Sequence, residues 1–298
     1  MTLLKVEGLT KRFGRFTALH GVDMQLEAGE IFGFIGPNGA GKTTTLRILM
    51  GVIRATGGQA TVFGQDAWRD AVEIHKRVAY VPGDVNLWSN LTGGEVIDFF
   101  ARLRGSRDHT QQEQLMQRFE LDPSKKCRTY SKGNRQKVAL VAAFASQADL
   151  YILDEPTSGL DPLMEQVFRE CVRDAQAQGK TILLSSHILS EVEQLCDRVG
   201  IIRQGRMVET GTLNELRHLT RIGVTLETRQ PVEGLAAVPG VYGLEPMAAG
   251  VRFQVDTGAL AAVVSHVAPF GVTKLESAPP TLEDLFMRHY HANGGEGA

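Results

Sequence analysis

A glycine-rich segment with one lysine and one threonine is the first feature of the sequence that could do chemistry. It matches the phosphate-binding pattern Gly-x-x-x-x-Gly-Lys-Thr. Glycines let backbone N–H groups converge on phosphate oxygens, a lysine reaches the β- and γ-phosphates, and a threonine hydroxyl ligates Mg²⁺. We therefore predict that this segment binds ATP, with Lys42 also catalytic and Thr43 also on the metal. The predicted ATP-binding residues are Gly36, Pro37, Asn38, Gly39, Ala40, Gly41, Lys42, Thr43 and Thr44.

Two adjacent carboxylates, Asp154 and Glu155, follow the apolar run Leu150–Leu153. A buried strand delivers such residues to the carboxyl edge of a sheet, where nucleotides bind in open α/β folds. Asp154 is predicted to hold Mg²⁺, and Glu155 to deprotonate the water that attacks the γ-phosphate. Paired acids alone are equally consistent with a solvated turn or a helix cap. The phosphate-binding loop favours the catalytic interpretation.

The elements that must position these residues are short apolar strands. Ile31–Ile35 precedes the loop, a helical run Thr44–Met50 follows it, and Thr181–Leu184 is a further compact apolar run. Strands that alternate with helices indicate a largely parallel sheet with helices on its faces. Thr92 and Glu95 form the pattern of a capping box at the start of another helix.

Composition limits the remaining possibilities. A chain of 298 residues suggests about two domains, and 32 Lys+Arg against 34 Asp+Glu give a net charge of −2, without bias toward nucleic acid. The most apolar stretch, Val138–Ala145, is well short of the ~20 residues of a membrane span. The N-terminus does not resemble a signal peptide. Cys127, Cys171 and Cys196 lack metal-ligand spacing and are expected to be small apolar residues in a reducing compartment.

Four further segments, in order, make the chain resemble the nucleotide-binding subunit of an ATP-binding cassette (ABC) transporter, over roughly residues 3 to 215. Phe13 stands where the family has an aromatic residue against adenine, and His187 ends a strand as the family's switch histidine does. The other two segments resemble the signature loop (Tyr130-Ser131-Lys132-Gly133-Asn134) and the D-loop (Ser158-Gly159-Leu160-Asp161).

The resemblance implies an α/β P-loop NTPase core with a helical subdomain. The cassette spans residues 1–220, with the subdomain at about 85–145. Catalysis then falls to Glu155, His187 and Lys42, and Ser131 and Gly133 complete the ATP site of a second cassette. Ser131, Gly133 and Asp161 form the dimer interface. Phe13 stacks on adenine, although Phe13 or the nearby Phe16 could instead belong to the core.

One position departs from the family. Most members have a glutamine that contacts Mg²⁺ and senses the membrane partner, and this chain has Gly83-Asp84. Asp84 could serve the metal indirectly, or water could replace the ligand. Permease coupling is assigned to Gly83 and Asp84, and docking to the region Asp84 to Arg104.

Residues 221–298 form a second, small α+β domain in our prediction, with net charge −3 against +1 for residues 1–220. Its expected helices are Val232–Val238 and Leu260–Val267. The segment Pro279–Phe286 resembles that of exporter-type cassettes, which suggests a dimerisation or regulatory role, with a role in stability alone as the alternative. Residues 291–298 are expected to be a disordered tail.

The leading hypothesis is therefore an ATPase subunit that converts ATP to ADP and phosphate, with Mg²⁺, and powers a membrane exporter. Its partners are a separate transmembrane permease and a second cassette, the same chain or a related one; no nucleic acid is expected. It would lie in the cytoplasm, peripheral on the inner face of the membrane. One alternative is a soluble ABC ATPase acting on nucleic acid or the ribosome, and another is a nucleotide sensor that does not hydrolyse ATP. The sequence does not encode the cargo.

Overall fold

The computed structural model describes residues 1–105, 109–218, 222–247 and 250–278. The chain divides into two compact units, Met1–Thr210 and Gly211–Ala298. This division lies shortly before residue 220, where the composition changes. Pro279–Phe286 and the tail at 291–298 fall outside the described residues. Among the helices that are described, none is long and apolar enough to cross a bilayer.

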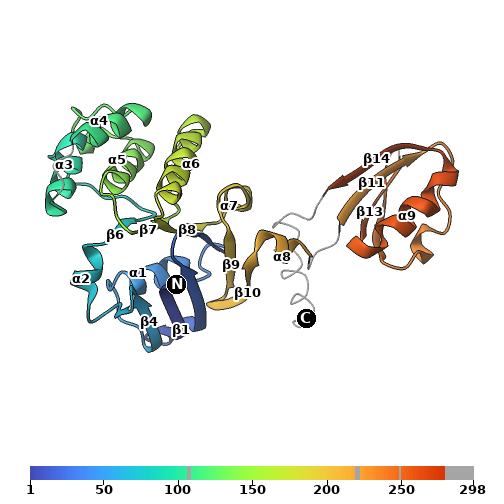
Figure 1. The fold of residues 1–298 in the computed structure, drawn as a ribbon, viewed down its shortest axis with the longest axis horizontal. Coiled ribbons are helices and arrows are strands. Elements are labelled where there is room, and N and C mark those ends of the chain that lie inside the picture. Colours follow the sequence, from blue (N-terminus) through green and yellow to red (C-terminus); the bar gives the residue numbers. More distant parts are fainter. Residues whose placement is uncertain (106–108, 219–221, 248–249, 279–298) are drawn as a thin grey trace. The chain divides into compact units, whose positions relative to one another are not determined.

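A buried sheet with a parallel centre forms the middle of the first unit (Figure 1). Its strand order is β10-β9-β3-β8-β7-β6, and β9, β3, β8, β7 and β6 run parallel to their neighbours. Every residue of β3, β7 and β8 is buried, which explains why these strands appear as unbroken apolar runs. The predicted α/β fold class is confirmed. The bounds are β3 Ile31–Ile35, β6 Val78–Val81, β7 Leu150–Asp154, β8 Thr181–Ser186, β9 Arg198–Arg203 and β10 Arg206–Thr212.

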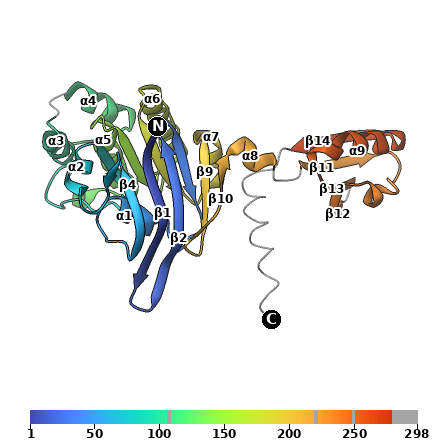
Figure 2. The same ribbon diagram turned by 60° about the horizontal axis from the view of Figure 1, so that its bottom comes forward.

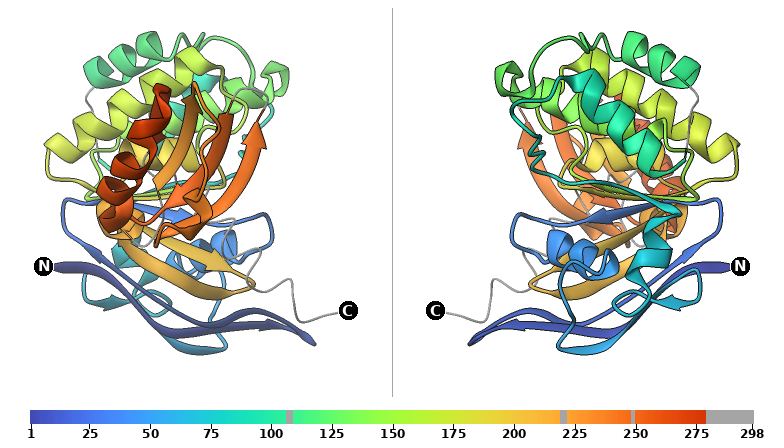
Figure 3. Two further views of the ribbon diagram at one scale, coloured as in Figure 1. Left: turned by 90° about the vertical axis from the view of Figure 1, so that its right-hand side faces the viewer. Right: turned by 90° about the vertical axis from the view of Figure 1, so that its left-hand side faces the viewer.

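A second sheet of the same unit is antiparallel, in the order β2-β1-β4-β5. Its strands are β1 Thr2–Phe13, β2 Phe16–Glu27, β4 Gly57–Val62 and β5 Gln65–Asp66, and β1 with β2 forms the long hairpin of Figure 2. Helix α1 (Lys42–Leu49) lies between the two sheets (Figure 3). Its Leu46 and Leu49 share one core with Leu4 of β1 and Ile152 of β7. This packing fixes the start of α1 against the end of β3.

The remaining helices of the first unit include a group beside β6 and β7 (Figure 1), which corresponds to the expected helical subdomain. Its first helix, α3, starts at the predicted capping box: Thr92 Oγ1 accepts from the Glu95 N–H at 3.1 Å, and Glu95 Oε2 accepts from the Thr92 N–H at 2.6 Å. The helices are α2 Ala71–His75, α3 Gly93–Leu103, α4 His109–Arg118, α5 Lys132–Phe144, α6 Pro162–Ala177 and α7 Leu189–Leu195.

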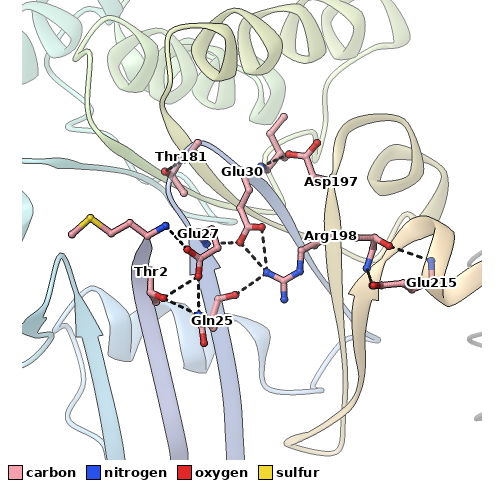
Figure 4. Close-up of polar contacts among 12 residues, drawn as sticks. Thr2, Gln25, Glu27, Glu30, Thr181, Asp197, Arg198 and Glu215 are labelled. Atoms are coloured by element: carbon pink, nitrogen blue, oxygen red, sulfur yellow. Dashed lines mark hydrogen bonds and ion pairs between the residues drawn. The ribbon is translucent and has the colours of Figure 1, made fainter.

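Charged groups join the amino ends of the parallel strands (Figure 4). Arg198 Nη1 lies 3.2 Å from Glu30 Oε2, and Glu30 Oε1 accepts from the Glu27 N–H at 2.7 Å. Asp197 Oδ2 accepts from the Ile31 N–H at 2.8 Å, and Thr181 Oγ1 accepts from the Gly29 N–H at 2.9 Å. These contacts tie the turn before β3 to β8 and β9.

The second unit begins with α8 (Leu213–His218) and contains an antiparallel sheet in the order β12-β13-β11-β14. Val263 and Val267 of α9 (Leu260–Val267) pack in one core with Phe253 and Val255. The strands are β11 Ile222–Thr228, β12 Val241–Met247, β13 Gly250–Val255 and β14 Val272–Ala278.

The expected helix at Val232–Val238 is wrong. Only a short 3₁₀ turn forms there, at Leu235–Ala237. Gly234 before the turn has a left-handed φ of 73°, and Pro239 follows the segment. Both residues interrupt a helix, because the first leaves helical geometry and the second lacks the N–H that a longer helix would need.

Candidate ATP-binding and catalytic site

The phosphate-binding loop joins the end of β3 to the first residue of α1. Gly39 and Gly41 have left-handed φ angles of 79° and 114°, which side-chain-bearing residues rarely adopt. A Cβ at Gly36 would lie 2.3 Å from the carbonyl oxygen of Ile202. The loop conformation therefore requires these glycines, and the N–H groups of the first turn of α1 are free of intrahelical partners.

Lys42 is buried at the start of α1, with only 5% of its surface exposed. Its ammonium donates to the carbonyl oxygens of Gly36 at 2.5 Å and Pro37 at 3.4 Å. It also lies 3.1 Å from Glu155 Oε1. The partners of this ammonium are two neutral carbonyl groups and one carboxylate. A buried positive charge with these partners can bind a further anion such as a phosphate.

Glu155 follows the last residue of β7 and has a left-handed φ of 48°. This strained backbone is held in place because the Glu155 N–H donates to the Ser185 carbonyl oxygen at 3.1 Å. Glu155 Oε2 lies 2.5 Å from Nδ1 of His187, so three separate segments bring Lys42, Glu155 and His187 together. Their catalytic roles remain predictions.

Asp154 is buried at the end of β7 and accepts a 2.5 Å hydrogen bond from Ser185 Oγ. Together with the Thr43 hydroxyl, the Lys42 ammonium and the N–H groups of α1, it supplies the donor set that a magnesium-bound nucleoside triphosphate needs. The residues present therefore fit the predicted ligands, and Thr43 and Asp154 are the residues that would hold the metal.

The predicted signature loop packs against the predicted D-loop within the same chain. Ser131 caps α5, with its hydroxyl accepting from the Asn134 N–H at 3.2 Å, and Lys132 Nζ donates to Ser158 Oγ at 2.7 Å. A Cβ at Gly133 would lie 2.3 Å from the Gly159 carbonyl oxygen.

Asp161 caps α6 by accepting from the N–H groups of Leu163 and Met164. Ser131, Gly133 and Asp161 thus have local structural roles. Their roles toward a second cassette stay predictions.

Phe13, which is predicted to stack on adenine, pairs with Phe16 at the end of the β1–β2 hairpin. They are 48% and 67% exposed, so neither is a core residue. Phe16 lines a cavity of about 400 Å³ together with Gly39 of the phosphate-binding loop. Lys11 Nζ lies 4.8 Å from the ring centre of Phe13. The assignment of adenine stacking to Phe13 remains a prediction.

Gly83 lies against the turn that carries the two carboxylates. A Cβ at Gly83 would lie 3.3 Å from the Asp154 carbonyl oxygen and 3.6 Å from Glu155 Cβ. Asp84 Oδ2 accepts from the Asn86 side chain at 3.5 Å. The position that departs from the family therefore remains next to the site.

An open groove of about 950 Å³ begins beside this segment. Its lining includes Tyr80 and Pro82, Leu87, and Phe100, Leu103 and Arg104. Burial, and then the charge of Asp154, raises the pKa of Tyr80 to about 12, so its phenol is neutral. The guanidinium of Arg104 donates to the Val78 carbonyl oxygen.

An aromatic cluster of Trp88, Phe99 and Phe100 lies on the surface next to this groove. All three side chains are exposed, and the Trp88 and Phe99 rings meet edge to face with their centres 5.4 Å apart. Sequence reasoning treated the phenylalanines only as part of a helical pattern. Trp88 lies outside the helix that carries both phenylalanines, so its contacts with them depend on the tertiary structure.

Comparisons with known proteins agree with this geometry. The ABC transporter family matches residues 19–158, and the C-terminal domain of DrrA1-3-like ATP-binding proteins matches residues 211–290. The chain is 32% identical to the daunorubicin resistance ATP-binding protein DrrA3 of Streptomyces coeruleorubidus, over 96% of this chain and 95% of that protein. It is 30% identical to the linearmycin resistance ATP-binding protein LnrL of Bacillus subtilis, over 96% of this chain and 97% of that protein.

A solved structure of an ATP-binding subunit of an ABC transporter superposes with a TM-score of 0.68 at 33% identity, covering 73% of this chain and 92% of that one. The comparisons give no support to an ATPase that acts on nucleic acid or the ribosome. Both the site and its relatives lead to one assignment: the chain belongs to the family of ATP-binding subunits of ABC transporters.

Proposed function

We propose that this chain hydrolyses ATP to ADP and phosphate and that the reaction drives export through a separate membrane permease. The observation that carries the proposal is the chain of contacts from Lys42 through Glu155 to His187. A cation, a carboxylate and an imidazole in contact at the carboxyl edge of a parallel sheet are suited to phosphoryl transfer to water.

Glu155 is the general base in this proposal. Its carboxylate faces the Lys42 ammonium at 3.1 Å. Phosphate oxygens compete for that ammonium, which then stabilises their charge and leaves Glu155 free to accept a proton from water.

His187 orients Glu155 and the attacking water, because its Nδ1 is already within 2.5 Å of the carboxylate. When bound by Thr43 and Asp154, Mg²⁺ supplies positive charge that neutralises the phosphate oxygens. At the position where most family members have a glutamine, this chain has Gly83. We propose that a water molecule occupies the place of the glutamine side chain.

Two cassettes form the working unit in this proposal, with Ser131 and Gly133 on the nucleotide of the partner and Asp161 at the interface. The N-terminus of α5 has an unneutralised first turn without acidic residues, which suits a phosphate. The cassette is proposed to span residues 1–220, and the domain at 221–298 is proposed to assist dimerisation or regulation.

The groove beside Gly83 and the aromatic cluster are the proposed docking site of the permease. Exposed apolar side chains in one patch are typical of a protein contact, and this patch falls in the region Asp84 to Arg104. Docking there would hold the chain on the inner face of the membrane. Relatives named for daunorubicin and linearmycin resistance support export as the direction. Co-purification with a polytopic membrane protein tests this part of the proposal.

The test of hydrolysis is the Glu155→Gln variant of the full chain. Loss of the base is expected to reduce turnover on the order of 10²- to 10⁴-fold while ATP still binds and traps a dimer. Phosphate release, nucleotide binding and size-exclusion chromatography with ATP measure these quantities. ATPase activity near that of the wild type in this variant would exclude Glu155 as the base, and a wild-type chain that binds ATP without hydrolysis, even with its permease, would indicate a nucleotide sensor.

A further inference from the structure

Glu191 is a buried carboxylic residue for which the proposed mechanism has no use. It lies on α7, four residues after His187, and only 7% of its surface is exposed. Buried carboxyl groups are rare because removal of their charge from water is costly. The surrounding structure should therefore explain why a carboxyl group is buried at this position.

The contacts of Glu191 join the two sides of the catalytic pair. Its Oε2 accepts from Ser186 Oγ at 3.1 Å and from Thr157 Oγ1 at 3.2 Å. Ser186 directly precedes His187, and Thr157 follows Glu155 by two residues. One carboxyl oxygen therefore links the segment that carries the histidine to the segment that carries the proposed general base.

Both hydroxyl groups are attached to backbone whose position is fixed. Ser186 Oγ also accepts from the Ile188 N–H at 2.9 Å, and the turn that contains Thr157 is closed by a 3.1 Å bond from the Ser158 N–H to the Glu155 carbonyl oxygen. Glu191 is therefore connected, through these hydroxyl groups, to the segments that carry His187 and Glu155. A misplacement of reacting groups by about 1 Å can reduce an enzymatic rate on the order of 100-fold.

The second oxygen of Glu191, Oε1, is buried without a hydrogen-bond partner among the described residues. An apolar side chain would avoid this cost, so packing alone does not explain the carboxyl group. We propose that Glu191 is a positioning residue for ATP hydrolysis, which holds the loop of His187 and the turn of Glu155 at the separation that their 2.5 Å contact requires. This inference rests on the proposed function of that pair.

The test compares Glu191→Ala with Glu191→Gln in the full-length chain. The amide oxygen of glutamine can still accept from both hydroxyl groups, whereas alanine cannot. We expect Glu191→Ala to lower kcat on the order of 10- to 100-fold with KM for ATP within about 2-fold, and Glu191→Gln to restore most of the loss. Ser186→Ala should lower kcat less in the Glu191→Ala background than in the wild type, because only its bond from the Ile188 N–H is then left to lose.

Gln112→Ala is the matched control, since Gln112 is also buried, on α4, and its Nε2 has no partner among the described atoms. It is expected to lower the melting temperature without changing kcat of the folded protein. Equal loss of kcat in Glu191→Ala and Gln112→Ala, or no rescue by glutamine, would overturn the proposal.

A second readout does not depend on turnover. The imidazole NMR signals of His187 are expected to shift in Glu191→Ala and to stay near their wild-type positions in Glu191→Gln. Unchanged signals in the alanine variant would refute the positioning role. If the wild-type chain did not hydrolyse ATP, the proposed function would fail while this measurement still decided the role of Glu191.

Discussion

The two edges of the parallel sheet carry charged residues of similar type but use them in opposite ways. At the amino edge, Arg198 lies 3.2 Å from Glu30, and Asp197 accepts from the Ile31 N–H (Figure 4). Asp197 also accepts from the Gln176 side chain. At the carboxyl edge, Glu155 is shared between Lys42 and His187 on a strained backbone. The first edge is a structural network, and the second carries the residues that are proposed to bind and hydrolyse ATP.

The difference shows that residues at one end of the parallel strands can stabilise the fold while residues at the other end are used for chemistry. Strain and incompletely satisfied polar groups lower stability, so they persist only where the surrounding structure supports them. Two examples lie beside the candidate site: Glu155 has a left-handed φ, and Glu191 Oε1 is buried without a partner among the described residues. Substitutions at the two edges should therefore affect different measured quantities.

Among the substitutions that compare the two edges, the largest effect is expected at Lys42. In Lys42→Ala the buried ammonium is lost, so affinity for ATP should fall on the order of 100-fold and turnover with it, while the melting temperature changes little or rises. Fluorescent nucleotide titration and differential scanning fluorimetry measure both quantities. Lys5→Ala, which removes one partner of an exposed ion pair with Glu7, is the control and should bind ATP as the wild type does. A Lys42→Ala variant with normal affinity would contradict the proposed phosphate site.

An intermediate effect, on stability instead of chemistry, is expected at Arg198. Arg198→Met keeps an apolar stem but leaves the largely buried Glu30 without its cationic partner, which should lower the free energy of unfolding by about 2 kcal/mol. Urea denaturation measures this change, and the ATPase rate per folded molecule should not change. Arg102→Met breaks an exposed pair with Asp98 on α3 and should cost no more than about 0.5 kcal/mol. If the two variants lowered the free energy of unfolding equally, the amino-edge network would contribute no more to stability than an exposed ion pair does.

The smallest effect is expected in the pH dependence of stability at Glu191. Burial, and then the charges of Glu165 and Glu155, raise the pKa of this carboxyl, although hydrogen bonds from Thr157 and Ser186 oppose the shift. A raised folded-state pKa means that the native chain retains a proton which the unfolded chain releases, so the contribution of Glu191 to stability falls as the pH rises through that range. Stability of Glu191→Gln relative to the wild type should therefore increase from pH 5 to pH 8, as measured by thermal unfolding. A relative stability that decreases over this range would show that the carboxylate form is the one favoured by the fold.

Much of the site could be predicted from residue order. The loop Gly36–Thr43 and the strand end at Asp154 follow from local patterns, because glycine conformation and a buried strand depend on nearby residues. The contact between Glu155 and His187 could not be derived from those patterns, since it depends on β7 and β8 being neighbours in the sheet. The helix predicted at Val232–Val238 is absent although the cause is local. The apolar spacing favoured a helix, and the effect of the nearby glycine and proline was underestimated.

The sequence by itself determined the α/β class, the phosphate-binding loop and the identity of the residues that could hold ATP and Mg²⁺. These features are encoded within short segments whose backbone geometry and side-chain chemistry are local. The tertiary structure decided which of them meet: Lys42 with Glu155, Glu155 with His187, and Glu191 with the hydroxyl groups on both sides of that pair. It did so because the order of strands in a parallel sheet, and not their distance along the chain, sets which loops lie side by side at its carboxyl edge.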